Sequence, residues 1–300
     1  MIEYKFDNIL LDRFDPEQNY IQLDNIDFKL ENLPGYETSK GASSNLFVLI
    51  DPEDEYPDRV IKICKSPLEL GNNKRIVRFK REIRAFKIAK SKALRNVIEY
   101  HGSGEVEIAG YNFLYIVMEK ADEDLASYME ANQFNFSLNQ KLSFCVNILN
   151  GIKQLHSLNI YHRDIKHDNI LRIGNEFKVG DLGLVRFQNE DFSIDKDNEK
   201  VGPFGWLSPE ATNKMLTFKK KVGHIYDCDI NYKSDIFQLG KLFWYIFQAN
   251  LPIGQLDNDH HFEDDIFAVL RLMLQYDKQR RPDMAQLETL LQPLMLKYAV

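Results

Sequence analysis

The stretch that decides the fold of this 300-residue chain is His162-Arg163-Asp164-Ile165-Lys166-His167-Asp168-Asn169. Seventeen residues after Asp164 comes a second short motif, Asp181-Leu182-Gly183. Together the two motifs bring a carboxylate, a lysine, an amide and a second carboxylate into a short span of chain. Phosphoryl transfer needs such a set, because a carboxylate orients the attacking hydroxyl while cations neutralise the phosphate charge.

Four side chains of these motifs are candidates for that chemistry. Asp164 is suited to orienting a hydroxyl, and Lys166 offers a positive charge to the transferred group. Asn169 and Asp181 supply oxygen ligands, which suit Mg²⁺ because it is a hard cation. We therefore predict Asp164 and Lys166 as catalytic residues, with Asn169 and Asp181 as ligands of the metal.

The order of these motifs resembles the protein kinase family, serine/threonine type. The family's catalytic loop, H-R-D-x-x-x-x-N, is matched at every fixed position, and Lys166 follows the pattern of serine/threonine rather than tyrosine kinases. The family's D-F-G motif is present as residues 181–183 with leucine for phenylalanine, and its A-P-E motif as Ser208-Pro209-Glu210. The likeness extends from about residue 36 to 290 and implies ATP and Mg²⁺ as cofactors and a protein as substrate.

The resemblance implies an α+β class and a two-lobed protein-kinase fold. We expect an N-terminal extension over residues 1–35, a small lobe with a five-stranded sheet over 36–118, and a hinge with a helical lobe over 119–300. Arg281 is expected to pair with Glu210 in the helical lobe. Hydrophobic periodicity itself favours strands at 20–23, 46–50, 60–64 and 114–118, and helices at 74–92, 142–155, 234–247 and 266–276.

One lysine lies inside the otherwise apolar strand at 60–64. Lys62 needs a counter-charge if it is buried. Glu82 is the single acid between Lys74 and Arg95 and lies on the apolar face of the expected helix, which predicts a Lys62–Glu82 ion pair. By resemblance this pair clamps the phosphates of ATP. The resemblance also assigns nucleotide contacts to Gly41, Ser44, Leu46, Val60, Met118, Glu119, Ala121, Asp124 and Leu171.

The segment that follows the strand at 114–118 is the expected hinge. Met118 falls at the family's gatekeeper position, and residues 119–121 would contact adenine. Asp124 matches an acid that often meets the ribose, although a solvated turn residue explains it equally well.

Two departures from the family pattern bear on the predicted activity. The glycine-rich loop, aligned with residues 39–46, keeps only its middle glycine, Gly41, whereas glycines let a backbone approach phosphates closely. Pro203 stands where serine/threonine kinases have a threonine that braces the catalytic aspartate and lysine. A nucleotide-binding pseudokinase scaffold is therefore an alternative, against which the retained lysine and aspartates speak.

A second alternative is a small-molecule kinase of the aminoglycoside or choline type. Such enzymes share an H-x-D-x-x-x-x-N core with this chain. Arg163, Lys166 and the motif at 208–210 favour a protein substrate instead.

Bulk properties limit the partners and the compartment. The net charge of −7 argues against nucleic acid as the main partner, and no apolar run approaches the roughly 20 residues of a membrane helix. The N-terminus lacks the pattern of a signal peptide. The cysteines, Cys64, Cys145 and Cys228, are widely spaced and odd in number, which predicts no disulfide framework and a cytoplasmic location.

Charge is distributed unevenly along the chain. The expected helix at 74–92 holds nine basic residues, although the whole chain is acidic. This helix is either an ordinary solvated surface or a docking site for an acidic partner. The nine are Lys74, Arg75, Arg78, Lys80, Arg81, Arg84, Lys87, Lys90 and Lys92.

The segment between Asp181 and Glu210 is acidic and has only two hydroxyl residues, Ser193 and Ser208. In kinases with an arginine at position 163, a phosphate on this segment often pairs with it. A carboxylate makes a similar contact, so we predict a kinase active without that phosphate. The alternative is that the acids are solvated and Ser193 is regulatory. The acids are Glu190, Asp191, Asp195, Asp197 and Glu199.

Overall fold

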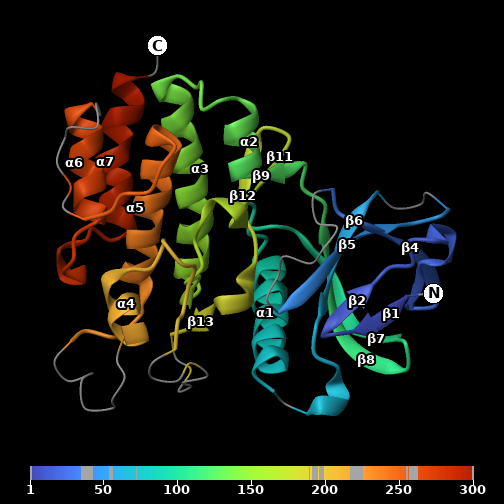
Figure 1. Cartoon of the computed structure of the whole chain (residues 1–300). Coiled ribbons are helices and arrows are strands. Elements are labelled where there is room, and N and C mark those ends of the chain that lie inside the picture. The colour runs from blue at the N-terminus through green and yellow to red at the C-terminus, as the bar shows by residue number, and fades with distance from the viewer. Residues whose placement is uncertain are drawn as a thin grey trace. The chain divides into compact units, whose positions relative to one another are not determined.

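The computed structural model describes most of the chain, which forms two compact units (Figure 1). The N-terminal unit comprises Met1–Ala93 and Ile98–Lys120, and the C-terminal unit comprises Leu94–Val97 and Ala121–Val300. The first is rich in strands and the second in helices, as expected for the predicted α+β class. The described residues are 2–34, 43–53, 57–71, 73–188, 190, 195, 199–216, 226–254, 256 and 263–298.

A six-stranded antiparallel sheet is the centre of the N-terminal unit, instead of the five strands predicted. Residues 44–119 supply four of these strands and residues 20–32 supply the other two, as a hairpin whose turn, Asp24-Asn25, adopts positive φ angles of 51° and 67°. Its inward side chains join the same core. In spatial order the strands are β3 (Tyr20–Leu23), β4 (Ile26–Asn32), β5 (Ser44–Ile50), β6 (Arg59–Cys64), β8 (Tyr111–Glu119) and β7 (Tyr100–Ile108).

The first residues of the chain pack on this sheet. Strands β1 (Glu3–Lys5) and β2 (Asn8–Leu10) form a separate hairpin. Ile9 is buried in the core of the sheet, and the Tyr4 ring lies 5.0 Å from that of Phe113. Short 3₁₀ turns follow at η1 (Pro16–Gln18) and η2 (Leu68–Leu70).

Helix α1 (Lys74–Ser91) confirms the predicted basic helix. It begins where the side chain of Asn73 accepts a hydrogen bond from the backbone of Ile76, which caps the first turn. One face is buried against strands β6, β7 and β8 of the same unit. The buried residues are Ile76, Phe79, Glu82, Ala85, Phe86 and Ala89.

The C-terminal unit is built on helices, two of which match the predictions at 142–155 and 234–247. The helix predicted at 266–276 ends earlier, at Met273. The carbonyl oxygens of Gln275 and Tyr276 accept hydrogen bonds from the Arg281 guanidinium, which holds the chain in a turn there. The helices are α2 (Leu125–Ala131), α3 (Leu138–Ser157), α4 (Pro209–Leu216), α5 (Tyr232–Gln248), α6 (Asp264–Met273) and α7 (Met284–Lys297), with a 3₁₀ turn, η6 (Lys278–Arg280), before α7.

Short strands and turns place the two sequence motifs in this unit. The first motif follows β10 (Ile160–Tyr161) and ends in a 3₁₀ turn, η3 (His167–Asn169). The second begins two residues after β12 (Glu176–Val179) with Asp181, which precedes the 3₁₀ turn η4 (Leu182–Leu184), so that Leu182 and Gly183 belong to that turn. The strands pair as β12 (Glu176–Val179) with β11 (Ile170–Ile173), β11 with β9 (Glu123–Asp124), and β10 with β13 (Arg186–Phe187).

No helix within the described residues combines the length and the apolar character needed to cross a membrane.

Candidate active site

The predicted ion pair between Lys62 and Glu82 is present in the N-terminal unit. Lys62 lies on β6 between Leu46 of β5 and Ile116 of β8. Its Nζ donates to Oε1 of Glu82 on α1 at 2.7 Å, with the two side chains 9% and 2% exposed. Burial of both groups means that loss of either partner would leave an uncompensated charge.

The other predicted nucleotide residues of this unit lie on three adjacent strands. Val60 is in register with Met118, and Leu46 with Lys62, so the two pairs are neighbours in the sheet. Gly41 lies outside the described residues. The described members are Ser44 and Leu46 on β5, Val60 on β6, and Met118 and Glu119 on β8.

In the C-terminal unit, helix α5 holds the backbone of the catalytic loop. The Asp235 carboxylate, fully buried, accepts from the backbone N–H groups of His162 and Arg163, both at 2.8 Å. Gln238 accepts from the Ile165 N–H at 3.1 Å and donates to the Arg163 carbonyl at 3.3 Å. Arg163 has a φ of 70°, a strained conformation that these bonds sustain. Sequence reasoning gave Gln238 no role.

The buried His162 ring connects the two motifs. Its Nδ1 accepts from the backbone N–H of Asp164 at 3.2 Å, so the proton lies on Nε2, which donates to the Gly180 carbonyl at 3.0 Å. The imidazole therefore holds the residue before Asp181 beside the catalytic loop and acts as a positioning group.

Asp164 and Asn169 form a hydrogen-bonded unit. The Asn169 amide donates to the backbone carbonyl of Asp164 at 2.7 Å and to its Oδ2 at 2.8 Å. Burial raises the pKa of the Asp164 carboxyl, and the negative charge of Asp181 raises it further. Both bonds use the amide nitrogen of Asn169, so its Oδ1 takes no part in them and remains chemically suited to a cation. A divalent cation would also relieve the repulsion between the two carboxylates, so these residues fit a metal.

Asp181 is held in a left-handed conformation with a φ of 47°, and its Oδ1 accepts from the Gly183 N–H at 3.2 Å. The preceding Gly180 packs so closely that a Cβ there would lie 2.8 Å from Leu171 Cδ1. Among the described residues, no group of three or more His, Cys, Asp or Glu side chains is arranged to hold a metal. Mg²⁺ is often bound by one or two protein groups plus phosphate oxygens, which agrees with this sparse ligand set.

Lys166 is the second predicted catalytic residue and is half-buried. Its Nζ donates to Oδ2 of Asp168 at 2.8 Å. Burial lowers the pKa of Lys166, but the Asp168 hydrogen bond and the charges of Asp168, Asp164 and Asp181 raise it above its usual value. Lys166 therefore remains positively charged. Asp168 was not assigned a role from the sequence, although it belongs to the motif.

Three further predicted nucleotide residues lie in the C-terminal unit. Asp124 Oδ1 accepts from the backbone N–H of Ser127 at 2.8 Å and so caps α2. Its backbone pairs with Leu171 across β9 and β11. Ala121 precedes this strand. Asp124 thus has a structural role that the sequence did not indicate, and its contact with a ribose stays a prediction.

The acidic segment contributes one carboxylate to Arg163, as predicted. Arg163 Nη2 donates to Oδ2 of Asp195, and both residues are buried. Burial lowers the pKa of the Arg163 guanidinium, and the charge of Asp195 opposes that shift. Ser193, Asp191 and Asp197 lie outside the described residues.

The predicted pair of Glu210 with Arg281 is also present. The guanidinium donates to both carboxylate oxygens, at 2.8 and 2.9 Å, with the side chains 2% and 0% exposed. Ser234 Oγ donates a further bond to Glu210 at 2.6 Å. This network connects α4, α5 and the turn before α7.

Comparison with known families agrees with this arrangement. The protein kinase domain matches residues 41–297, which is most of the chain. The chain belongs to the protein kinase family. The predicted family and its fold, with a β-rich N-terminal region and a helical C-terminal part, are thereby confirmed.

Several curated kinases are similar to this one at low identity. The probable serine/threonine-protein kinase ireA of Dictyostelium discoideum is 29% identical over 164 residues, 49% of this chain and 15% of that protein. The dual specificity protein kinase TTK of Mus musculus is 24% identical over 225 residues, 73% of this chain and 24% of TTK. The serine/threonine-protein kinase CLA4 of Candida albicans is 28% identical over 186 residues, 61% of this chain and 18% of CLA4. This kinase thus spans less than two thirds of the length of each.

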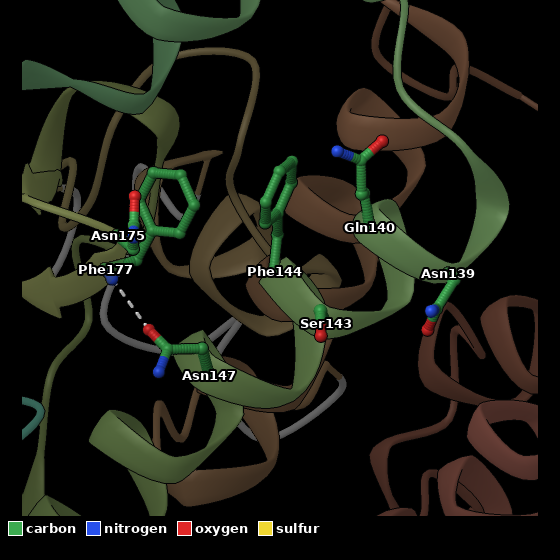
Figure 2. Close-up of a pocket in the computed structure, with 7 residues that line it drawn as sticks. All are labelled: Asn139, Gln140, Ser143, Phe144, Asn147, Asn175 and Phe177. Atoms are coloured by element: carbon green, nitrogen blue, oxygen red, sulfur yellow. Dashed lines mark hydrogen bonds between the residues drawn. The ribbon is translucent and has the colours of Figure 1, made fainter. Parts of the chain in front are cut away.

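A separate pocket of about 290 Å³ lies in the C-terminal unit, and its lining residues carry no charge (Figure 2). The Asn147 side chain accepts from the Phe177 N–H at 2.7 Å, which joins α3 to β12. None of the predicted site residues lines it. Because no lining residue is positively charged, the pocket does not suit a phosphate group. It is lined by Asn139, Gln140, Ser143, Phe144, Asn147, Asn175 and Phe177.

Proposed function

We propose that this kinase transfers the γ-phosphoryl group of ATP to serine or threonine hydroxyls of a protein, with Mg²⁺ as cofactor. The observation that carries the proposal is the Asp164–Asn169 unit beside the charge of Asp181, together with a Lys166 that remains charged. The printed names of ireA and CLA4 support serine/threonine specificity, whereas TTK is named a dual specificity kinase.

In the proposed mechanism each side chain has one task. The Asp164 carboxylate accepts a hydrogen bond from the substrate hydroxyl and directs it, and Asn169 keeps that carboxylate in place. Lys166 neutralises charge on the transferred group. Asn169 Oδ1 and the Asp181 carboxylate hold Mg²⁺, which when bound neutralises charge on the phosphates.

Nucleotide binding is proposed for the predicted residues. Lys62, oriented by its ion pair with Glu82, contacts the phosphates. Further nucleotide contacts are proposed for Gly41, Ser44, Leu46, Val60, Met118, Glu119, Ala121, Asp124 and Leu171.

We also propose a cytoplasmic location and an acidic protein partner at α1. All three cysteines are free thiols, which suits a reducing compartment. The excess of basic residues on α1 supports the proposal of an acidic partner, because opposite charges attract.

Incubation with γ-labelled ATP and Mg²⁺ tests the proposed function directly. The acceptors are matched peptides that differ only in serine, threonine or tyrosine at one position, plus an aminoglycoside and choline. Label should appear on the serine and threonine peptides and disappear with the Asp164→Asn variant. Label on the metabolites alone would indicate a small-molecule kinase. ATP binding without any transfer would indicate a pseudokinase scaffold.

A further inference from the structure

The hairpin of β1 and β2 is attached to β5 by a buried hydrogen bond. Asn45, the second residue of β5, accepts from the backbone N–H of Ile9 through its Oδ1 at 3.2 Å, and 2% of Asn45 is exposed. Its neighbours Ser44 and Leu46 are proposed to contact the nucleotide, and Leu46 is in register with Lys62. The hairpin thus holds β5 at the place where this strand pairs with the lysine of the proposed nucleotide site.

The same hairpin is attached to α1. Asp7, in the turn between β1 and β2, accepts from Arg75 Nη1 through its Oδ2 at 2.9 Å. Arg75 lies seven residues before Glu82, which is close to two helical turns, so the two side chains leave the helix on nearly the same side. The hairpin therefore contacts α1 on the side that carries the partner of Lys62.

A tyrosine fixes the hairpin between these two attachments. Oη of Tyr4 donates at 3.0 Å to the carbonyl oxygen of Lys65, the residue that follows β6, and lies 3.4 Å from Asp7 Oδ1. The Tyr4 ring packs at 5.0 Å from the ring of Phe113 and 5.5 Å from that of Tyr111, both on β8. The hairpin thus contacts β5, β8, the end of β6 and the start of α1, all within the N-terminal unit.

The place of these contacts indicates what the hairpin does. Asp7 and Arg75 have side chains that are 59% and 39% exposed, and an ion pair so exposed adds little to the stability of a fold. It does, however, connect the hairpin to the helix that carries Glu82. Asn45 belongs to the segment 39–46, which aligns with the glycine-rich loop, so the hairpin also fixes the last residues of that segment.

We propose that the β1–β2 hairpin is a positioning element of the nucleotide site, which acts through Asn45 on β5 and Arg75 on α1. It holds both elements in the arrangement in which Lys62 meets Glu82 before ATP binds. Groups that are ordered in advance lose less entropy when a ligand binds, so the hairpin strengthens ATP binding without touching the nucleotide. This role rests on the nucleotide binding that is part of the proposed function, and deepens it.

Calorimetric titration with ATP and Mg²⁺ tests the positioning role. Asp7→Asn removes the charge and tolerates the positive φ of 59° at this position, and Asn45→Ala removes the acceptor of the buried bond. The double variant Asp7→Asn/Asn45→Ala should bind ATP about tenfold more weakly than the wild type. In transfer to a serine peptide, its KM for ATP should rise while kcat and the KM for the peptide change less than about twofold.

Asn19→Ala is the matched control in the same unit. Asn19 is also 2% exposed, and its Oδ1 likewise accepts from a backbone N–H, that of Asp12 at 2.8 Å. This variant should lower the melting temperature at least as much as Asn45→Ala but change the ATP affinity less than about twofold. Amide hydrogen exchange in the first turns of α1 should be faster in the double variant than in Asn19→Ala.

A second pair of variants serves if Asn45→Ala does not fold. Asp7→Asn and Arg75→Gln change only the exposed contact, and circular dichroism checks their fold. Each should weaken ATP binding by about threefold, and their combination should weaken it no further, because both remove the same interaction. Additive losses would show that the two residues act separately, which would overturn the proposed connection between hairpin and helix.

The remaining outcomes separate this role from the proposed function. Equal loss of ATP affinity in the double variant and in Asn19→Ala would show that general destabilisation weakens binding, which would refute a positioning role. Wild-type ATP affinity in all hairpin variants would refute it too, and would leave the proposed function intact. Absence of ATP binding to the wild type would refute the proposed function and the positioning role together.

Discussion

Asn169 donates both hydrogens of its side-chain amide to Asp164, one to the backbone carbonyl at 2.7 Å and one to Oδ2 at 2.8 Å. The same amide thus fixes the carboxylate that is proposed to orient the hydroxyl and presents its own oxygen to the proposed metal. Orientation of the hydroxyl and metal binding are therefore coupled through one side chain.

The Asn169→Ala variant should lose both functions at once. Removing the amide frees the Asp164 carboxylate and deletes one oxygen ligand, so kcat should fall by roughly 10²–10³-fold. The Mg²⁺ concentration for half-maximal rate should rise. A Mg²⁺ titration of the initial rate measures both effects. Asn175→Ala, on the exposed turn between β11 and β12, is the control and should behave as wild type. An unchanged Mg²⁺ requirement in Asn169→Ala would remove Asn169 from the metal site.

Variants of Lys62 and Glu82 allow effects on stability to be separated from effects on activity. Lys62→Met should abolish autophosphorylation, and it also leaves Glu82 buried without its partner, at a cost of roughly 3–5 kcal/mol. The double variant Lys62→Met/Glu82→Leu should recover most of the lost melting temperature, because apolar replacement of a buried pair is often neutral or stabilising.

That double variant should nevertheless stay inactive. Asp181→Ala should abolish autophosphorylation as well, without the loss of stability expected for Lys62→Met. Autophosphorylation with labelled ATP and thermal melts are the two measurements. Near-normal activity in Lys62→Met or Asp181→Ala would refute the assignment of that residue.

Residues that act on a substrate could be predicted from the sequence more reliably than residues that hold the site in place. Asp164 and Asn169 were found because phosphoryl transfer demands particular groups at a particular spacing. Asp235 and Gln238 bond to backbone N–H and C=O groups of the catalytic loop, and such groups leave no pattern in the loop sequence. The buried Lys62–Glu82 pair was predictable because the helix offers only one acid.

The hairpin near the N-terminus could be predicted only in part, for a different reason. The alternation at 20–23 indicated β3, but β4 was not predicted, and its partner in the sheet is β5, which begins at Ser44. A four-residue strand shows too few alternations to fix its register, and its burial depends on that distant pairing. The sixth strand of the sheet therefore became evident only in the structure.

The buried pair of Glu210 and Arg281 should make stability depend on pH. Burial raises the pKa of Glu210, but the Arg281 hydrogen bond and charge and the Ser234 bond lower it below the ordinary value of 4.5. A carboxylate with a lowered pKa stabilises the fold fully above that ordinary value, and the contribution is lost as pH falls through the folded-state pKa. Wild-type stability should therefore fall below about pH 4.5 in part through this group.

Two variants test this dependence. Glu210→Ala should lower the unfolding free energy at pH 7 by roughly 3–5 kcal/mol, because it leaves the Arg281 charge buried alone. The difference between wild type and Glu210→Ala should shrink as the pH falls below about 4.5, because the unfolded chain then binds a proton that the folded carboxylate, with its lowered pKa, resists. Urea unfolding between pH 7 and pH 3 measures the difference. A difference independent of pH would show that the charge of Glu210 is not what stabilises the network.

Asp195, in the acidic segment between Asp181 and Glu210, places a carboxylate at Arg163. In kinases with this arginine, a phosphate on the same segment often makes that contact. The contact is buried, and a buried arginine bonded to a carboxylate needs no further anion for its charge. We therefore expect the kinase to be active without phosphate on this acidic segment. Ser193→Ala, expressed with a phosphatase and shown by mass spectrometry to carry no phosphate, should keep most of its initial rate.

Removal of the Asp195 carboxylate should lower the initial rate more than removal of the Ser193 hydroxyl. Asp195→Asn keeps the shape of the side chain but removes its charge, which leaves Arg163 buried without an anion. Its initial rate should fall by about tenfold or more, because the lost pairing is worth at least about 1.4 kcal/mol. Asp283→Asn is a control that removes one carboxylate from the N-cap of α7 and should keep the wild-type rate. If Ser193→Ala is inactive while Asp195→Asn keeps its rate, phosphate on Ser193 and not the Asp195 carboxylate controls the kinase.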